Sequence, residues 1–229
     1  MLAESFDRII LAVPDLADAI IQYTALLGAC PVQRAAKPDP RAWWNLGNTV
    51  LELREQAVAA ARIDAIVLRC ANASASETPV ENTLGVDVYV CDGSFVAGLC
   101  AAQAQAPLRV DHLVMRTRDA DACIALFAHE LGLRLALDKT VAQWGGRMLF
   151  FRVGKLTLEV IAPGTPDEEN AFWGIAFGHP DIETYSATLT ARGVAASAVR
   201  EGRKPGTQVA SVKSHALGVP TLLIGPVSA

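Results

Sequence analysis

The sequence predicts an α+β protein built from a repeated β-α-β-β-β unit. Three observations lead to this prediction. A shift of 104 positions places Asp7 on Asp111 and Gly28 on Gly132, with apolar character matching through most of the positions between them, so the chain contains an internal repeat. Each copy combines short strand-like apolar runs with one longer helical segment. Each copy then ends in two apolar runs separated by a glycine-containing turn, which is typical of a hairpin.

The first strand and the helix have counterparts in both copies. The runs RIILAV, which begins at Arg8, and HLVMR, which begins at His112, predict the two first strands. Asp15 and Asp119 stand where a helix N-cap belongs. The matched glycines stand where a residue in the left-handed conformation ends the helix.

The hairpin that closes each unit determines which side chains share a face. Residues 41–55 turn at Gly47-Asn48, and residues 146–163 turn near Gly154. Side chains alternate between the two faces of a strand, so the length of the turn sets the register. A two- or four-residue turn places Met148, Phe150 and Arg152 on the face of Glu159, whereas a three-residue turn reverses that assignment. The same argument places Trp43 and Asn45 with Glu52.

A weaker copy follows each strong one. Residues 172–194 repeat the strand and the capped helix, with Asp181 on Asp119 at a shift of 62, whereas the segment after Glu55 is a degraded copy with a poor helix. We therefore expect four modules, at residues 5–56, 61–104, 108–163 and 171–227. They form two domains, an N-terminal half at 1–106 and a C-terminal half at 107–229 that carries the candidate active site.

Composition excludes several classes of protein. A net charge of −4 and scattered basic residues argue against a nucleic-acid-binding surface. The apolar runs stop well short of the 18 or so residues that a membrane span needs, and the N-terminus has no secretory signal pattern. The 5 cysteines include no CxxC pair, which favours reduced thiols in a cytoplasmic protein. Hydrolase, phosphate-loop, zinc-protease and dinucleotide-binding motifs are absent from the sequence.

The duplicated unit, with VDHLVMRTRDADA opening one copy and KLTLEVIAP closing it, resembles the vicinal oxygen chelate superfamily. This group includes glyoxalases, bleomycin-resistance proteins, methylmalonyl-CoA epimerase and extradiol dioxygenases. The resemblance implies that modules pair into two cup-shaped mixed sheets, and that a divalent metal binds inside a cup. It places metal ligands on the first and last strands of a module, at His112 and Glu159. Zinc, manganese, iron, cobalt and nickel all suit these two ligands.

The complete ligand set stays open at this point. Extradiol dioxygenases draw further ligands from positions that are Gly174 and Leu222 here, which argues against ring cleavage by that pattern. If modules one and three face each other, in one chain or across a homodimer, Glu52 becomes a third ligand. If consecutive modules pair, which we favour, His112 and Glu159 are the two ligands from the repeat. A salt bridge from Glu159 to an arginine, Arg147 or Arg152, is the non-metal alternative.

The remaining candidates line the cup or belong to the first half. The predicted substrate-binding residues are Arg152, Phe150, Trp144, Trp173 and His215, and His215 is also the best outside candidate for a further ligand. Arg8 replaces the histidine in the first half, and a guanidinium cannot bind a metal because it keeps its proton. We expect a buried Arg8–Glu52 ion pair in a structural first half, with an anion-binding pocket as the alternative.

These residues predict a metal-dependent lyase, isomerase or oxygenase that acts on a small oxygen-rich substrate. The resemblance implies that two substrate oxygens chelate the metal, which polarises a carbonyl. Glu159 is the candidate for moving the proton. The alternative from another class is a metal-free protein that holds a small hydrophobic molecule in the same cup.

Overall fold

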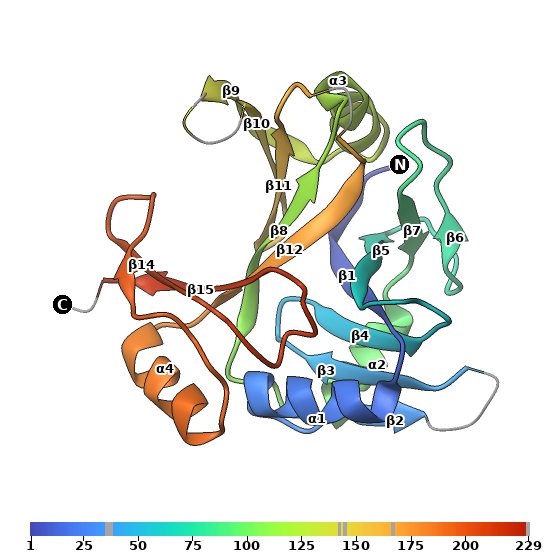
Figure 1. The fold of residues 1–229 in the computed structure, drawn as a ribbon. Coiled ribbons are helices and arrows are strands. Elements are labelled where there is room, and N and C mark those ends of the chain that lie inside the picture. Colours follow the sequence, from blue (N-terminus) through green and yellow to red (C-terminus); the bar gives the residue numbers. More distant parts are fainter. Residues whose placement is uncertain (35–38, 142, 144–145, 166–167, 228–229) are drawn as a thin grey trace.

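The computed structural model describes residues 1–34, 39–141, 143, 146–165 and 168–227, which form two mixed β-sheets (Figure 1). Sheet A has the strand order β2-β3-β4-β1-β5-β7-β6, and sheet B has the order β13-β14-β15-β12-β8-β11-β10-β9. The strands of sheet A are β1 (Ala3–Val13), β2 (Val32–Arg34), β3 (Arg41–Asn45), β4 (Val50–Glu55), β5 (Arg62–Cys70), β6 (Thr78–Pro79) and β7 (Asp87–Cys91). Those of sheet B are β8 (Arg109–Arg116), β9 (Arg134–Val141), β10 (Gly146–Val153), β11 (Leu156–Ala162), β12 (Ala171–Gly178), β13 (Arg200–Glu201), β14 (Thr207–Ser211) and β15 (Thr221–Pro226).

The helices α1, α3 and α4 begin at the predicted aspartate caps. The described helices are α1 (Leu16–Leu27), α2 (Ser94–Ala102), α3 (Ala120–Cys123), which continues as the π-helix η1 (Ile124–Glu130), and α4 (Ile182–Ala191). Asp15, Asp119 and Asp181 each accept a hydrogen bond from a backbone N–H in the first helical turn. Gly28 ends α1 in the left-handed conformation, with φ 68°. None of the described helices is long and apolar enough to cross a membrane.

Consecutive modules share a sheet. In sheet A the first strands β1 and β5 pair antiparallel, and in sheet B β8 and β12 do the same. Within each module the first strand also lies parallel to the last one, in the pairs β1–β4, β5–β7, β8–β11 and β12–β15. The predicted α+β class with paired β-α-β-β-β modules is confirmed. The second module is the degraded one, because its strands β5, β6 and β7 precede the helix α2 instead of enclosing a helix.

One buried apolar cluster lies between the two sheets and under the helices. It contains Ile9 and Leu11 of β1 together with Leu113 and Met115 of β8. Because side chains alternate along a strand, the residues between these core positions face away from the other sheet. Each sheet therefore has a second face that points away from the shared core.

In sheet A this second face is covered by α2. The ring of Phe95 lies 5.4 Å from the ring of Trp43 and 4.8 Å from the guanidinium carbon of Arg8. At the end of the helix, Gln103 accepts a hydrogen bond from the backbone N–H of Asn45 at 3.0 Å. The cup of the first half is therefore filled by the protein itself.

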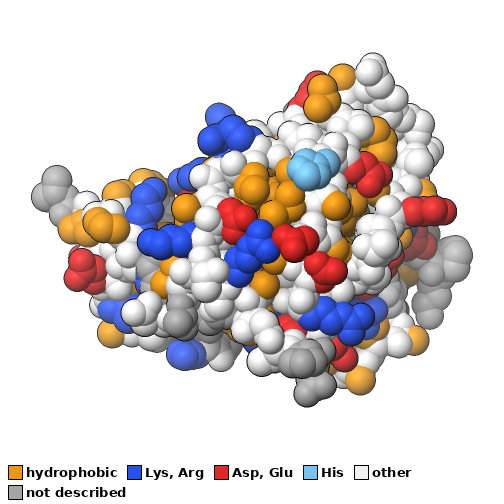
Figure 2. All heavy atoms as spheres, turned by 90° about the horizontal axis from the view of Figure 1, so that it is seen from above, with side chains coloured by type: hydrophobic (Ala, Val, Ile, Leu, Met, Phe, Trp, Pro, Cys, Tyr) orange, Lys and Arg blue, Asp and Glu red, His pale blue; other side chains and the backbone are white. Residues whose placement is uncertain are grey.

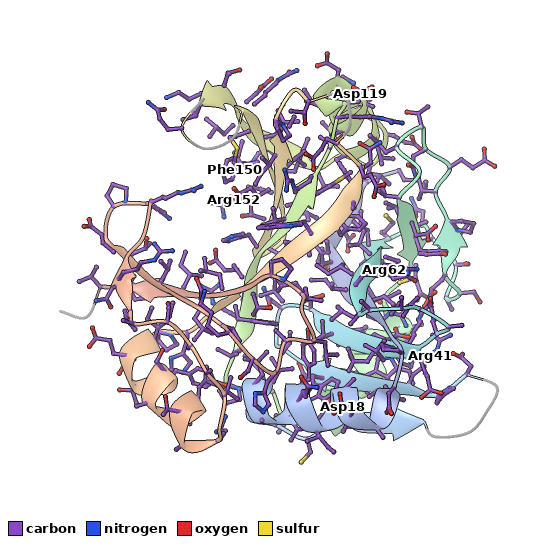
Figure 3. The ribbon with its side chains drawn as sticks, in the orientation of Figure 1. Asp18, Arg41, Arg62, Asp119, Phe150 and Arg152 are labelled. Atoms are coloured by element: carbon purple, nitrogen blue, oxygen red, sulfur yellow. The ribbon has the colours of Figure 1, made fainter. Side chains whose placement is uncertain are left out.

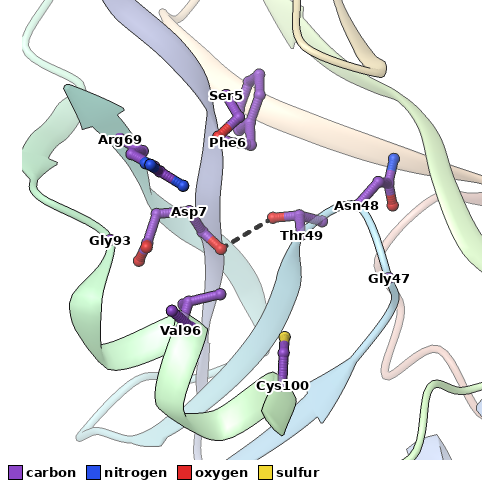
Figure 4. A pocket seen from close by; sticks show the side chains of 11 residues that line it. Ser5, Phe6, Asp7, Gly47, Asn48, Thr49, Arg69, Gly93, Val96 and Cys100 are labelled. Atoms are coloured by element: carbon purple, nitrogen blue, oxygen red, sulfur yellow. Dashed lines mark hydrogen bonds between the residues drawn. The ribbon is translucent and has the colours of Figure 1, made fainter. Parts of the chain in front are cut away.

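A cavity of about 150 Å³ remains between β1, the 47–49 turn and α2 (Figure 4). Asp7 lines it, and its carboxylate lies 2.9 Å from Nε of Arg8. Burial raises the pKa of Asp7, and the charge of Arg8 opposes that rise. Thr49 donates a hydrogen bond to the backbone oxygen of Asp7 at 3.2 Å. The lining residues include no histidine, so this cavity is not the site that the sequence predicts.

Beneath α2 lies a network of buried charges around Glu52. Arg8 and Glu52 are 5% and 0% exposed, and their nearest charged atoms are 3.6 Å apart, which confirms the predicted ion pair. Arg41 and Arg54 bind the other oxygen of Glu52 at 2.8 and 2.7 Å. Glu77 of the second module then contacts Arg8 at 3.0 Å and Arg54 at 2.8 Å. Several charges thus compensate one another around the buried Arg8 and Glu52.

We expect Glu52→Gln to lower the free energy of unfolding by about 3–5 kcal/mol, because it leaves neighbouring arginines without their carboxylate. Urea denaturation at neutral pH measures this change. A loss below about 1 kcal/mol, the range of solvent-exposed ion pairs, would show that the network is not coupled to folding.

Candidate functional site

The second face of sheet B carries the predicted His112 and Glu159 side by side. His112 lies on β8, and Glu159 lies on the parallel neighbour β11, with Thr157 directly beside His112 in register. Nε2 of His112 is 3.6 Å from Oε2 of Glu159, and the two side chains are 17% and 16% exposed. Strand alternation brings them together, because Leu113 and Leu158 turn into the core.

Asp111 orients the histidine. Nδ1 of His112 and Oδ2 of Asp111 are 3.0 Å apart, and because the carboxylate accepts, the proton resides on Nδ1. The hydrogen bond to His112 lowers the pKa of Asp111. The lone pair of Nε2 is then left for Glu159 or for a bound ligand. Sequence reasoning did not assign a role to Asp111, although the repeat aligns it with Asp7, which contacts Arg8 in the same way.

The two halves differ in what surrounds the glutamate. Phe150 lies opposite Glu159 as Trp43 lies opposite Glu52. In the same register, Met148 and Ile161 occupy the positions of Arg41 and Arg54, so the arginines that neutralise Glu52 are replaced by apolar side chains. Burial accordingly raises the pKa of Glu159, against the opposing charges of His112 and Arg203.

Neither of the two arginines considered as ion-pair partners binds Glu159. Arg147 contacts Asp121 at 2.7 Å and Asp138 at 2.8 Å. Acidic and basic side chains lie next to one another on this end of the molecule, over α3 and the β9–β10 hairpin (Figure 2). Arg152 shares the face of Glu159, because the turn between β10 and β11 has two residues, and it points with Phe150 toward the open side of sheet B (Figure 3). The predicted turn register is therefore correct.

The fourth module has no ligands at the equivalent positions. In the third module, Val114 of β8 pairs with Glu159 of β11 and with Gly174 of β12. In the fourth module, Ala176 of β12 pairs with Leu222 of β15 and with His112 of β8. This symmetry equates Gly174 with His112 and Leu222 with Glu159, as the sequence shift does. A Cβ atom at Gly174 would lie 2.8 Å from the backbone oxygen of Pro220, so no ligating side chain fits there.

The other predicted residues do not complete a metal site. Within the described residues, no group of three or more histidine, cysteine, aspartate or glutamate side chains could hold a metal ion, so His215 does not join His112 and Glu159. His215 has a left-handed backbone, with φ 62°, and its Nδ1 lies 2.7 Å from Oγ of Ser214. Trp173 is 44% exposed and stacks with Arg116 at 5.9 Å. Trp144 lies outside the described residues.

The raised pKa of Glu159 has a consequence for stability. A carboxyl whose folded pKa lies above its ordinary value of 4.5 stabilises the fold while it is protonated, and that contribution is lost as pH rises through the folded pKa. In chelator-treated protein we therefore expect Glu159→Gln to unfold at a higher temperature than the unchanged protein at pH 7.5, with the difference vanishing at pH 4. A variant that is less stable at pH 7.5 would show that the carboxylate has a compensating charge.

Comparisons with known proteins agree with this architecture. Residues 109–214 match the model of the Glyoxalase/Bleomycin resistance protein/Dioxygenase superfamily. A triple mutant of 4-hydroxymandelate synthase from Streptomyces coelicolor superposes with a TM-score of 0.76 at 14% identity, covering 99% of this chain and 94% of that one. A fusion of a xylose isomerase-like TIM barrel with 4-hydroxyphenylpyruvate dioxygenase gives a TM-score of 0.70 at 14% identity, covering 99% of this chain and 49% of the fusion. No curated protein matches the chain.

These identities are too low to carry an activity across, but the fold extends over both halves. The chain therefore has the glyoxalase-like fold of these structures over both halves, and its residues 109–214 match the model of the Glyoxalase/Bleomycin resistance protein/Dioxygenase superfamily.

Proposed function

We propose that the cup of sheet B binds a divalent metal through His112 and Glu159, and that the protein is a metal-dependent enzyme acting on a small oxygen-rich molecule. The observation that carries this proposal is the difference between the halves. Glu52 is neutralised by arginines, whereas Glu159 is buried beside an oriented histidine and two apolar side chains. A buried carboxylate of this kind needs a cation or a proton.

The donor set fits a divalent ion. Histidine nitrogen and carboxylate oxygen bind zinc at about 2.0–2.2 Å, so atoms 3.6 Å apart can contact one ion. The Asp111–His112 hydrogen bond is the carboxylate–histidine arrangement that fixes the tautomer of a ligating imidazole. Two protein ligands leave coordination positions for two oxygens of a substrate. When bound there, the metal supplies Lewis-acid polarisation of a substrate oxygen.

The remaining groups of the cup bind the substrate and move its proton. Glu159 is the carboxylate nearest to a molecule resting on His112, and its raised pKa makes it a stronger proton acceptor than an exposed glutamate. Phe150 and Ile161 flank it and exclude water from one side. These two apolar side chains suit an organic body that carries its oxygens at one end.

Metal content tests the ligands. We expect protein purified without chelators to bind a transition metal. His112→Ala and Glu159→Gln should each lose the metal, because each leaves only one of the two protein ligands. Asp111→Asn should weaken metal affinity by about 10–100-fold through the orientation of His112. Inductively coupled plasma analysis and competition titration measure both effects.

The exposed His129 on η1 provides a matched control, because His129→Ala should leave metal content unchanged. Equal metal content in His112→Ala and the unchanged protein would overturn the ligand assignment.

A metal-free binding protein is the second candidate function. It is favoured by the observation that the described residues offer no third protein ligand. In that case Glu159 acts with its own proton and His112 as its hydrogen-bond partner. If no metal is retained and none binds on addition, while a small organic ligand still raises the melting temperature, this second function holds and the enzyme proposal fails.

A further inference from the structure

Two arginines lie directly opposite each other at the edge of the same cup. Arg134 of β9 pairs in register with Arg152 of β10. The neighbouring residues Leu135 and Phe151 pack on the core, so both arginines point to the face of Glu159. Like charges that face each other across strands destabilise a sheet.

Nothing in the described part of the chain compensates this pair of charges. Neither Arg134 nor Arg152 has an acidic partner, a hydrogen bond or a ring contact among the described residues. The contrast with Arg147 on the same strand is direct, because Arg147 contacts two aspartates. Two unpaired guanidinium groups side by side form a fork that fits the oxygens of an oxyanion.

The arginines lie in the same row of the sheet as the candidate metal ligand. Arg152 pairs with Thr157 on β11, and Thr157 pairs with His112 on β8. Two strand spacings of about 4.8 Å therefore separate the backbone of Arg152 from that of His112. On the far side of His112 the row continues with Ala176, a small side chain that the protein buries.

The opposite wall of the cup is also basic. The hairpin between β13 and β14 carries Arg203 and Lys204. The charge of Arg203 acts on Glu159, and that of Lys204 acts on Asp111. Basic side chains therefore act on Glu159 and Asp111 from a second side, although the whole chain has a net charge of −4.

We propose that the cup takes a small organic anion whose carboxylate or equivalent oxyanion is bound by Arg134 and Arg152, with a neighbouring oxygen at His112 and Glu159. The second contact rests on the function proposed above, whereas the first depends on the arginines alone. The substrate class is thus an acid with a further oxygen close to its charged group and an apolar body against Phe150.

Salicylate and salicylamide are suitable probes, because both place a ring hydroxyl beside the variable group and only salicylate is charged. Isothermal titration at constant ionic strength, in chelator-treated protein, should show salicylate binding at least about tenfold more tightly than salicylamide. Arg152→Met and Arg134→Met should each remove most of that preference while leaving the affinity for salicylamide unchanged. Arg118→Met, which removes an exposed arginine outside the cup, is the control and should keep the preference.

Equal affinities for the two probes, no detectable salicylate binding, or an unchanged preference in Arg152→Met would each overturn the anion site. The outcome for the metal is separate. His112→Ala should keep the preference for salicylate in metal-free protein, so a protein that prefers salicylate yet binds no metal refutes only the metal-dependent function.

Melting temperature gives an independent readout that needs no ligand. Without added anion, Arg134→Met should raise it, because the substitution relieves the repulsion with Arg152. Salicylate should stabilise the unchanged protein more than this variant.

Discussion

A carboxylate buried on an apolar sheet face needs a compensating charge, and this requirement shapes both halves of the protein. The glutamate sits on the last strand of a module, beside the first strand, and its side chain is 0% exposed at Glu52 and 16% exposed at Glu159. In the first half, Arg8, Arg41 and Arg54 compensate Glu52. In the second half, His112 lies against Glu159, and apolar residues replace the other two arginines. One duplicated framework therefore yields a closed ionic core and an open site.

The helix α2 follows from the same difference. In the first half it lies over the second face of sheet A, with Phe95 against Arg8 and Trp43. The helix can cover this face because the arginines and glutamates beneath it are already paired with one another and need no ligand from solvent. The second half ends in strands β14 and β15 instead, and these extend sheet B as a wall of its cup.

The fourth module shows how the framework limits the ligand set. Its first strand has Gly174 where His112 stands in the third module, and the backbone at Pro220 fills the space of a side chain there. The protein therefore cannot assemble the symmetric ligand pairs that two complete modules would give. Among the described residues, the cup offers His112, Glu159 and the orienting Asp111, so any metal chemistry would depend on oxygens from the substrate.

The sequence by itself determined the repeat and the caps, and it placed Phe150 and Arg152 on the face of Glu159 for a two- or four-residue turn, which the structure has. These features are local, because alternation along a strand and capping at a helix end depend on neighbouring residues. The ion pair of Arg8 with Glu52 followed from the same repeat. The empty positions at Gly174 and Leu222 were also predicted by alignment, and the strand register supports them.

Only the tertiary structure decided which modules share a sheet, that α2 fills the first cup, and that Glu77 of another module joins the network around Glu52. The sequence also did not predict that Arg134 and Arg152 pair across β9 and β10. Their pairing depends on a β-bulge between Phe150 and Phe151 in the register of these two strands. A bulge changes the parity of every pair beyond it. Contacts between distant segments are set by such registers, and single-strand patterns do not encode them.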